Sequence, residues 1–171
     1  MRSADDFNLR ALYDALDARR RERNMSWTAV AVEVNRFRTK LRPIAVSTIT
    51  TLREKPVGEG DGILQMLMWL GRTPESFVPG IPAADSAPYR LPALSTGQIL
   101  RWDTRALFAA VNAERVTRRL TWTGLAREIG GFTPSMLTNL AKGGRTGLPH
   151  VMRLVRWLGR PAVSFTRIAP R

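Results

Sequence analysis

The sequence feature that most constrains this fold is an internal repeat. Residues 10–13 (RALY) recur 95 positions later as residues 105–108 (RALF), and residues 69–72 (WLGR) recur 88 positions later as residues 157–160. The two displacements differ by 95 − 88 = 7, which places a seven-residue insertion inside the first copy. Duplication predicts two similar folding units, so an interpretation of one copy can be tested against the other.

Apolar residues in both copies recur at helical spacing, as in the stripe formed by Trp122, Leu125, Ala126 and Ile129. This spacing places them on one face of a helix. We therefore expect an all-α protein with four to five helices in each copy. Residues 78–98 are rich in proline, which breaks helical patterns, and they predict a linker. The expected domains are residues 1–77 and 99–171.

A helical hairpin is predicted over residues 121–144. Thr121 can cap its first helix, and Gly130 and Gly131 end that helix. The Thr133 hydroxyl can cap the second helix by accepting a hydrogen bond from a free backbone N–H. Pro134 follows it, at a first helical position where the missing N–H costs nothing. Two further glycines, at 143 and 144, end this second helix.

The hairpin resembles the lambda-repressor-like helix-turn-helix family. The resemblance rests on the Leu125–Ala126 pair, the turn glycine Gly130, the inward Leu137 and the closing Gly143, while one extra glycine lengthens the turn. It implies two tandem helix-turn-helix domains joined by the proline-rich linker. The alternative is a helical hairpin within some other all-α domain, because short capped helices with a glycine turn are common.

Charge indicates the class of partner. The chain has 27 Lys and Arg against 14 Asp and Glu, a net charge of +13, which indicates a polyanionic partner. Residues 1–77 contain 13 bases and 10 acids, whereas residues 99–171 contain 13 bases and 3 acids. The second copy, at +10 against +3, is expected to supply most of the attraction to phosphate.

The composition argues against several other classes of function. With no cysteine and one histidine, disulfides, thiol nucleophiles, zinc fingers and histidine triads lack their parts. No phosphate-binding loop or metal-ligand spacing is present, so we expect no enzyme, no cofactor and no metal. No run of eighteen apolar residues and no signal peptide is seen, and we expect no membrane contact and a cytoplasmic, nucleoid-associated protein of bacterial or phage origin.

The candidate DNA contacts of the second copy are small polar and cationic side chains on and beside its second hairpin helix. The expected base contacts are Ser135, Met136, Thr138 and Asn139. The expected phosphate contacts are Thr121, Arg127, Thr133, Lys142 and Arg145.

In the first copy the expected base contacts are Ser47, Thr48, Thr50 and Thr51. The expected phosphate contacts lie in the insertion and are Arg36, Arg38, Lys40 and Arg42. This segment is either an extended cationic arm or a lengthened turn. Ala45 replaces the cap residue Thr133 of the second copy, and Glu54 replaces Lys142, so phosphate contact at this helix end is in question.

The leading functional hypothesis is a sequence-specific double-stranded DNA-binding transcriptional regulator, by resemblance a repressor. Because the two candidate reading helices differ in sequence, a monomer on a bipartite, asymmetric site is favoured, and a homodimer is left open. The main alternative is a protein–protein interaction module, such as an antitoxin-like or polymerase-binding adaptor, on the same scaffold. RNA binding lacks the usual signature of exposed aromatic residues on a sheet. No small-molecule effector is visible in the sequence.

Overall fold

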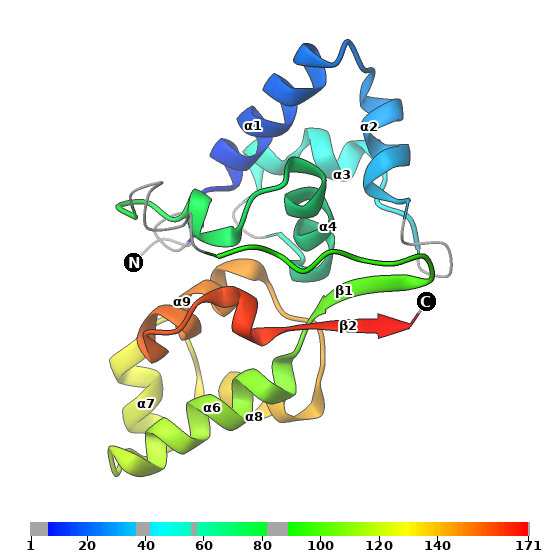
Figure 1. Ribbon diagram of the computed structural model, residues 1–171. Helices are drawn as coiled ribbons and strands as arrows, with labels where there is room; N and C mark the ends of the chain where they lie inside the picture. Colours follow the sequence, from blue (N-terminus) through cyan, green and yellow to red (C-terminus); the bar gives the residue numbers. More distant parts are fainter. Residues whose placement is uncertain (1–6, 37–41, 56–57, 82–88, 171) are drawn as a thin grey trace.

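The computed structural model describes residues 7–36, 42–55, 58–81 and 89–170 and is mostly helical (Figure 1). The described part of the first half contains four α-helices and two short 3-10 helices. They are α1 (Leu9–Glu22), α2 (Trp27–Val34), α3 (Val46–Thr50), η2 (Leu52–Glu54), α4 (Gly60–Leu70) and η3 (Pro74–Phe77).

The second half repeats this order and adds two strands. Its elements are β1 (Gln98–Trp102), α6 (Thr104–Thr117), α7 (Trp122–Ile129), α8 (Pro134–Asn139), η4 (Leu140–Lys142), α9 (Leu148–Leu158), η5 (Ala162–Phe165) and β2 (Thr166–Pro170). The predicted helical character of both copies is confirmed. Glycines in the left-handed conformation cap the closing helix of each half, because Gly71 and Gly159 end α4 and α9 at φ +67° and +63°.

The repeat extends to individual contacts between helices. Arg20 in α1 donates to the Met25 carbonyl and lies over the Trp27 ring, and Arg115 in α6 makes the same contacts with Leu120 and Trp122. Each of these contacts recurs at the displacement of 95 that the sequence shows. The contacts hold the first helix of each half against the start of the second, so the two halves share one internal architecture.

A second duplicated contact joins each second helix to the closing helix of its half. In the second half Glu128 accepts one hydrogen bond from the Trp157 indole N–H at 2.9 Å and forms an ion pair with Arg118 at 2.6 Å. The Trp157 hydrogen bond, with Arg118, lowers the pKa of Glu128 below its usual value. Glu33 accepts from Trp69 and pairs with Arg23 in the same way, and its pKa is lowered chiefly by the Arg23 hydrogen bond.

The two strands correct the all-α expectation. β1 and β2 pair antiparallel, with Leu100 opposite Ile168. Strand β1 follows the proline-rich segment, and only its first residue, Gln98, falls inside the predicted linker. The apolar side chains of β1 are buried, because the strand lies between α4 of the first half and strand β2 of the second (Figure 1).

The buried side chains of the two halves form one continuous apolar cluster. Helix α4 contacts both β1 and α9 across the boundary between the halves. Part of the predicted linker also joins this cluster, because Val78 is buried and Leu91 and Leu94 pack against the cluster, whereas residues 82–88 lie outside the described residues. The halves are therefore packed against each other as well as connected by the chain.

Candidate nucleic-acid interface

The hairpin of α7 and α8 is built as its sequence predicts. The Thr121 hydroxyl accepts from the Gly124 N–H at 3.0 Å, and the Thr133 hydroxyl accepts from the Met136 N–H at 3.2 Å. Both threonines satisfy backbone donors that a helix leaves free at its first turn. Below α8, Leu137 is completely buried, which anchors the short helix and leaves its opposite face in solvent.

All four candidate base-contacting residues of α8 lie on that exposed face: Ser135, Met136, Thr138 and Asn139. Three of them carry small hydrogen-bonding groups, and the fourth, Met136, is 37% exposed. The Thr138 hydroxyl donates to the Ser135 carbonyl at 3.2 Å, and its oxygen keeps acceptor capacity. The face can therefore offer hydrogen-bond donors, acceptors and one apolar contact to a partner.

The turn between α7 and α8 is held by an arginine that the sequence reasoning missed. Gly130 and Gly131 have φ of +71° and +70°, a region that strongly favours glycine. Arg153 of α9 donates to the Gly130 carbonyl at 2.8 Å, and its guanidinium occupies the space where a Cβ of Gly131 would lie. Arg153 is only 9% exposed, so this cation fixes the hairpin and does not belong to its outer surface. The sequence signal for this buried position is that Arg153 lies among the apolar residues of α9.

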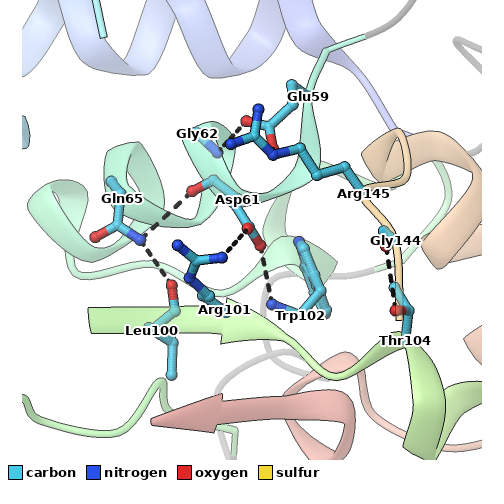
Figure 2. A network of polar contacts seen from close by, with 10 residues as sticks. All are labelled: Glu59, Asp61, Gly62, Gln65, Leu100, Arg101, Trp102, Thr104, Gly144 and Arg145. Carbon is cyan, nitrogen blue, oxygen red and sulfur yellow. Dashed lines mark hydrogen bonds and ion pairs between the residues drawn. The ribbon is translucent and has the colours of Figure 1, made fainter. Parts of the chain in front are cut away.

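The predicted phosphate contacts of the second half differ in their surroundings. Arg127 and Lys142 are exposed at the end of α7 and beyond the end of α8. Arg105 of α6 donates a hydrogen bond to the Lys142 carbonyl at 3.5 Å, which positions the backbone that carries the Lys142 side chain. Arg145 instead lies 4.0 Å from Glu59 of the first half, so it is placed at the boundary between the halves (Figure 2).

Helix α3 of the first half is shorter and less firmly capped. Ala45 makes no side-chain cap, as its sequence predicts. The Thr51 hydroxyl donates to the Ser47 carbonyl at 2.7 Å, and that of Thr50 donates to the same carbonyl at 3.5 Å. Ser47 and Thr48 are exposed, whereas Thr50 and Thr51 are half-buried. All four expected base contacts thus lie on or next to α3, and Thr50 and Thr51 are less exposed than their counterparts in the second half.

The two ends of the insertion in the first half are joined by an asparagine side chain, a contact that the sequence analysis did not predict. The Asn35 side chain donates to the Ile44 carbonyl and accepts from the Ile44 N–H, both at 2.8 Å. This double hydrogen bond brings the two ends of the segment together. Arg36 and Arg42 are exposed beside the junction, and the predicted contacts Arg38 and Lys40 lie outside the described residues.

The corresponding surfaces of the halves carry different charges. Val32 is 67% exposed on α2, at the position where α7 carries Arg127. Glu54, which pairs with Arg53 at 3.4 Å, stands where the second half carries Lys142. The α7–α8 surface is therefore the more favourable of the two for an anion.

Among the described residues, no three acidic or histidine side chains gather as a metal site would require. None of the helices described combines the length and the apolar character needed to cross a bilayer. Comparisons of the chain with models of protein families, with curated proteins and with solved structures found no match.

Proposed function

We propose that the chain is a sequence-specific double-stranded DNA-binding transcriptional regulator, acting in the cytoplasm as a repressor. The observation that carries the proposal is the outer face of α8. It presents small hydrogen-bonding side chains over a buried Leu137, with Arg127 and Lys142 exposed nearby. A narrow polar ridge flanked by cations suits the major groove, where base edges are read, with phosphates on either side.

The side chains of this ridge divide by the contacts they can make. The Asn139 amide can donate and accept at once, which suits a bidentate contact to adenine. Ser135 and Thr138 can bond to several base edges, and Met136 can contact the thymine methyl group. Lys142 and Arg127 neutralise phosphates without reading sequence. Under this proposal α3 is the second reading element, and its different side chains make the two half-sites unequal.

Selection from a random duplex library, followed by footprinting, tests the proposal directly. We expect an enriched bipartite motif with unequal halves. In the selected duplex Asn139→Ala should cost about 1–3 kcal/mol and relax the preference at one base pair. Lys142→Ala should weaken all duplexes alike and reduce the salt slope by about one. If no motif is enriched, or if Asn139→Ala leaves the motif and affinity unchanged, the proposed docking of α8 is wrong.

The exposed Val32 supports a second candidate, in which the first half contacts a protein partner. The second half provides a matched test, because Val32→Arg installs the residue found at position 127. If the first half reads DNA, this variant should strengthen binding to all duplexes and steepen the salt slope by about one. An unchanged affinity and slope would favour the protein-binding role for α2 and α3.

A further inference from the structure

The loops that follow the two candidate reading elements pair with each other in a reciprocal way. The Gly60 N–H donates to the Thr146 carbonyl at 3.1 Å, and the Leu148 N–H donates to the Gly58 carbonyl at 3.1 Å. Gly60 corresponds to Leu148 and Gly58 to Thr146 at the repeat displacement of 88. Exchanging the two halves therefore converts each hydrogen bond into the other.

This reciprocity is the signature of a two-fold axis. Glu59 and Gly147, which also correspond at a displacement of 88, form an antiparallel bridge at its centre. A self-complementary contact of this kind is what a symmetric dimer uses, here between the two halves of one chain. Helices α4 and α9 correspond to each other and are also in contact. In the view of Figure 1, a half-turn in the plane of the picture brings α1 and α2 approximately onto α6 and α7, so the two-fold axis runs roughly along the line of sight.

A two-fold rotation leaves the direction along its axis unchanged. Elements α3 and α8 occupy equivalent places in the two halves, so the part of each exposed face that points along the axis points to the same side of the molecule. Their helix directions across that side are reversed, as they are in a dimer that meets two inverted half-sites. A head-to-tail arrangement of the halves would instead have pointed both helices the same way.

We call the contact between the halves, centred on residues 58–60 and 146–148, the seam. Its backbone hydrogen bonds are symmetric, whereas its side-chain hydrogen bonds are not. On α4 the Asp61 carboxylate accepts from the Trp102 N–H at 3.1 Å, and the buried Gln65 amide donates to the Leu100 carbonyl at 2.9 Å (Figure 2). At the end of the first half the Glu75 carboxylate accepts from the buried Ala162 N–H at 2.6 Å. These side chains all belong to the first half, and the groups they bind all belong to the second.

The corresponding residues of the second half cannot replace them. Pro149, Arg153 and Val163 stand at the positions of Asp61, Gln65 and Glu75. A seam between two first halves would bring two Glu59 carboxylates together at the axis. A seam between two second halves would lack the carboxylate acceptors that Asp61 and Glu75 provide. Buried polar groups without partners are costly, so the seam favours one half of each kind.

From this seam we infer that the chain is a monomeric counterpart of a two-fold dimer, which reads two inverted, unequal half-sites at one fixed separation. The inference rests on the proposed function. The backbone pairing and the buried side-chain bonds hold α3 and α8 in one relative placement, so the separation is set by the seam and not by the reach of the proline-rich segment. A spacer change of half a helical turn should therefore be poorly tolerated.

The experiment starts from the duplex selected with the full-length chain, in which Asn139→Ala and Thr48→Ala identify the half-site of each helix. Four duplexes are then compared: inverted halves at the selected spacing, and three altered arrangements, in which the same halves form direct repeats or are inverted with 5 or 10 added base pairs. Light scattering of the complex gives the number of chains. We expect one chain per duplex and a loss on the order of 100-fold or more for all three altered arrangements, because the second docking event is lost.

The outcomes separate the inference from the proposed function. Absence of any enriched duplex would refute DNA reading itself. Enrichment of direct repeats, equal binding across the spacers, or two chains on one site would overturn the internal two-fold arrangement while leaving DNA reading intact.

Discussion

A single methyl group added at Gly60 tests the seam between the halves. Gly60 is buried at the start of α4, where its N–H pairs with the Thr146 carbonyl. A Cβ built on it would lie 2.8 Å from the Thr146 carbonyl oxygen and 2.8 Å from Cδ1 of Trp102. Both neighbours belong to the second half, and one is backbone, so the methyl group can be accommodated only by moving the halves apart.

The magnitude follows from the cost of overpacking. Forcing extra atoms into a packed site typically costs about 1–3 kcal/mol. Because Gly60 is the first residue of its helix, the helical preference of alanine offsets only part of this. In a chain of this size each kcal/mol lowers the Tm by roughly 2–4 °C, so Gly60→Ala should lower it by roughly 2–12 °C.

Gly144 provides the matched control on the other side of the same seam. A Cβ there meets no atom within 4 Å, and its backbone lies outside the left-handed region. Gly144→Ala should therefore change the stability by less than about 0.5 kcal/mol. Thermal unfolding followed by circular dichroism compares the two variants with the parent chain. Equal Tm values for Gly60→Ala and Gly144→Ala would refute the close contact of the halves at this point.

Three further outcomes are expected from local contacts. Thr133→Ala removes the cap of α8 and should cost about 0.5–2 kcal/mol in urea unfolding, whereas Ala45→Thr should stabilise the first half by installing the missing cap; an unchanged midpoint for both variants would contradict this account. Glu128→Gln tests whether ionisation of this carboxylate contributes to the pH dependence of stability. The folded pKa of Glu128 is lowered from 4.5, so its stabilisation is present above that pH and is lost as the pH falls through the folded pKa. The variant should therefore lose Tm at pH 7 and show a smaller further decrease at low pH than the parent; parallel Tm profiles would contradict it. Trp157→Phe removes the first cause of the same shift and should reproduce part of this effect.

The sequence was sufficient for features that depend on near neighbours along the chain. Thr121 and Thr133 were predicted as caps, because capping depends on residues within one turn. The repeat itself was visible as identical residues at constant displacement. The predicted exposure of the α8 ridge followed from the helical period once Leu137 was assigned to the inner face.

Strand β1 could not be predicted in this way. Its five residues gain their stability from β2, whose paired residues lie 64 to 72 positions later, and from α4 of the other half. Arg153 was likewise invisible as a turn anchor, since its contact with Gly130 joins α9 to the end of α7. Interactions of this kind depend on which elements meet, and composition carries little information about that.

The sequence by itself determined that there are two equivalent helical halves and which face of each second hairpin helix is polar. Only the tertiary structure decided how the halves meet. The reciprocal hydrogen bonds of Gly60 and Leu148 use backbone groups, which every residue but proline carries in the same form. No pattern of side chains in the sequence therefore predicts them. The unequal side chains around them, such as Asp61 and Gln65, became meaningful only when the groups opposite were known.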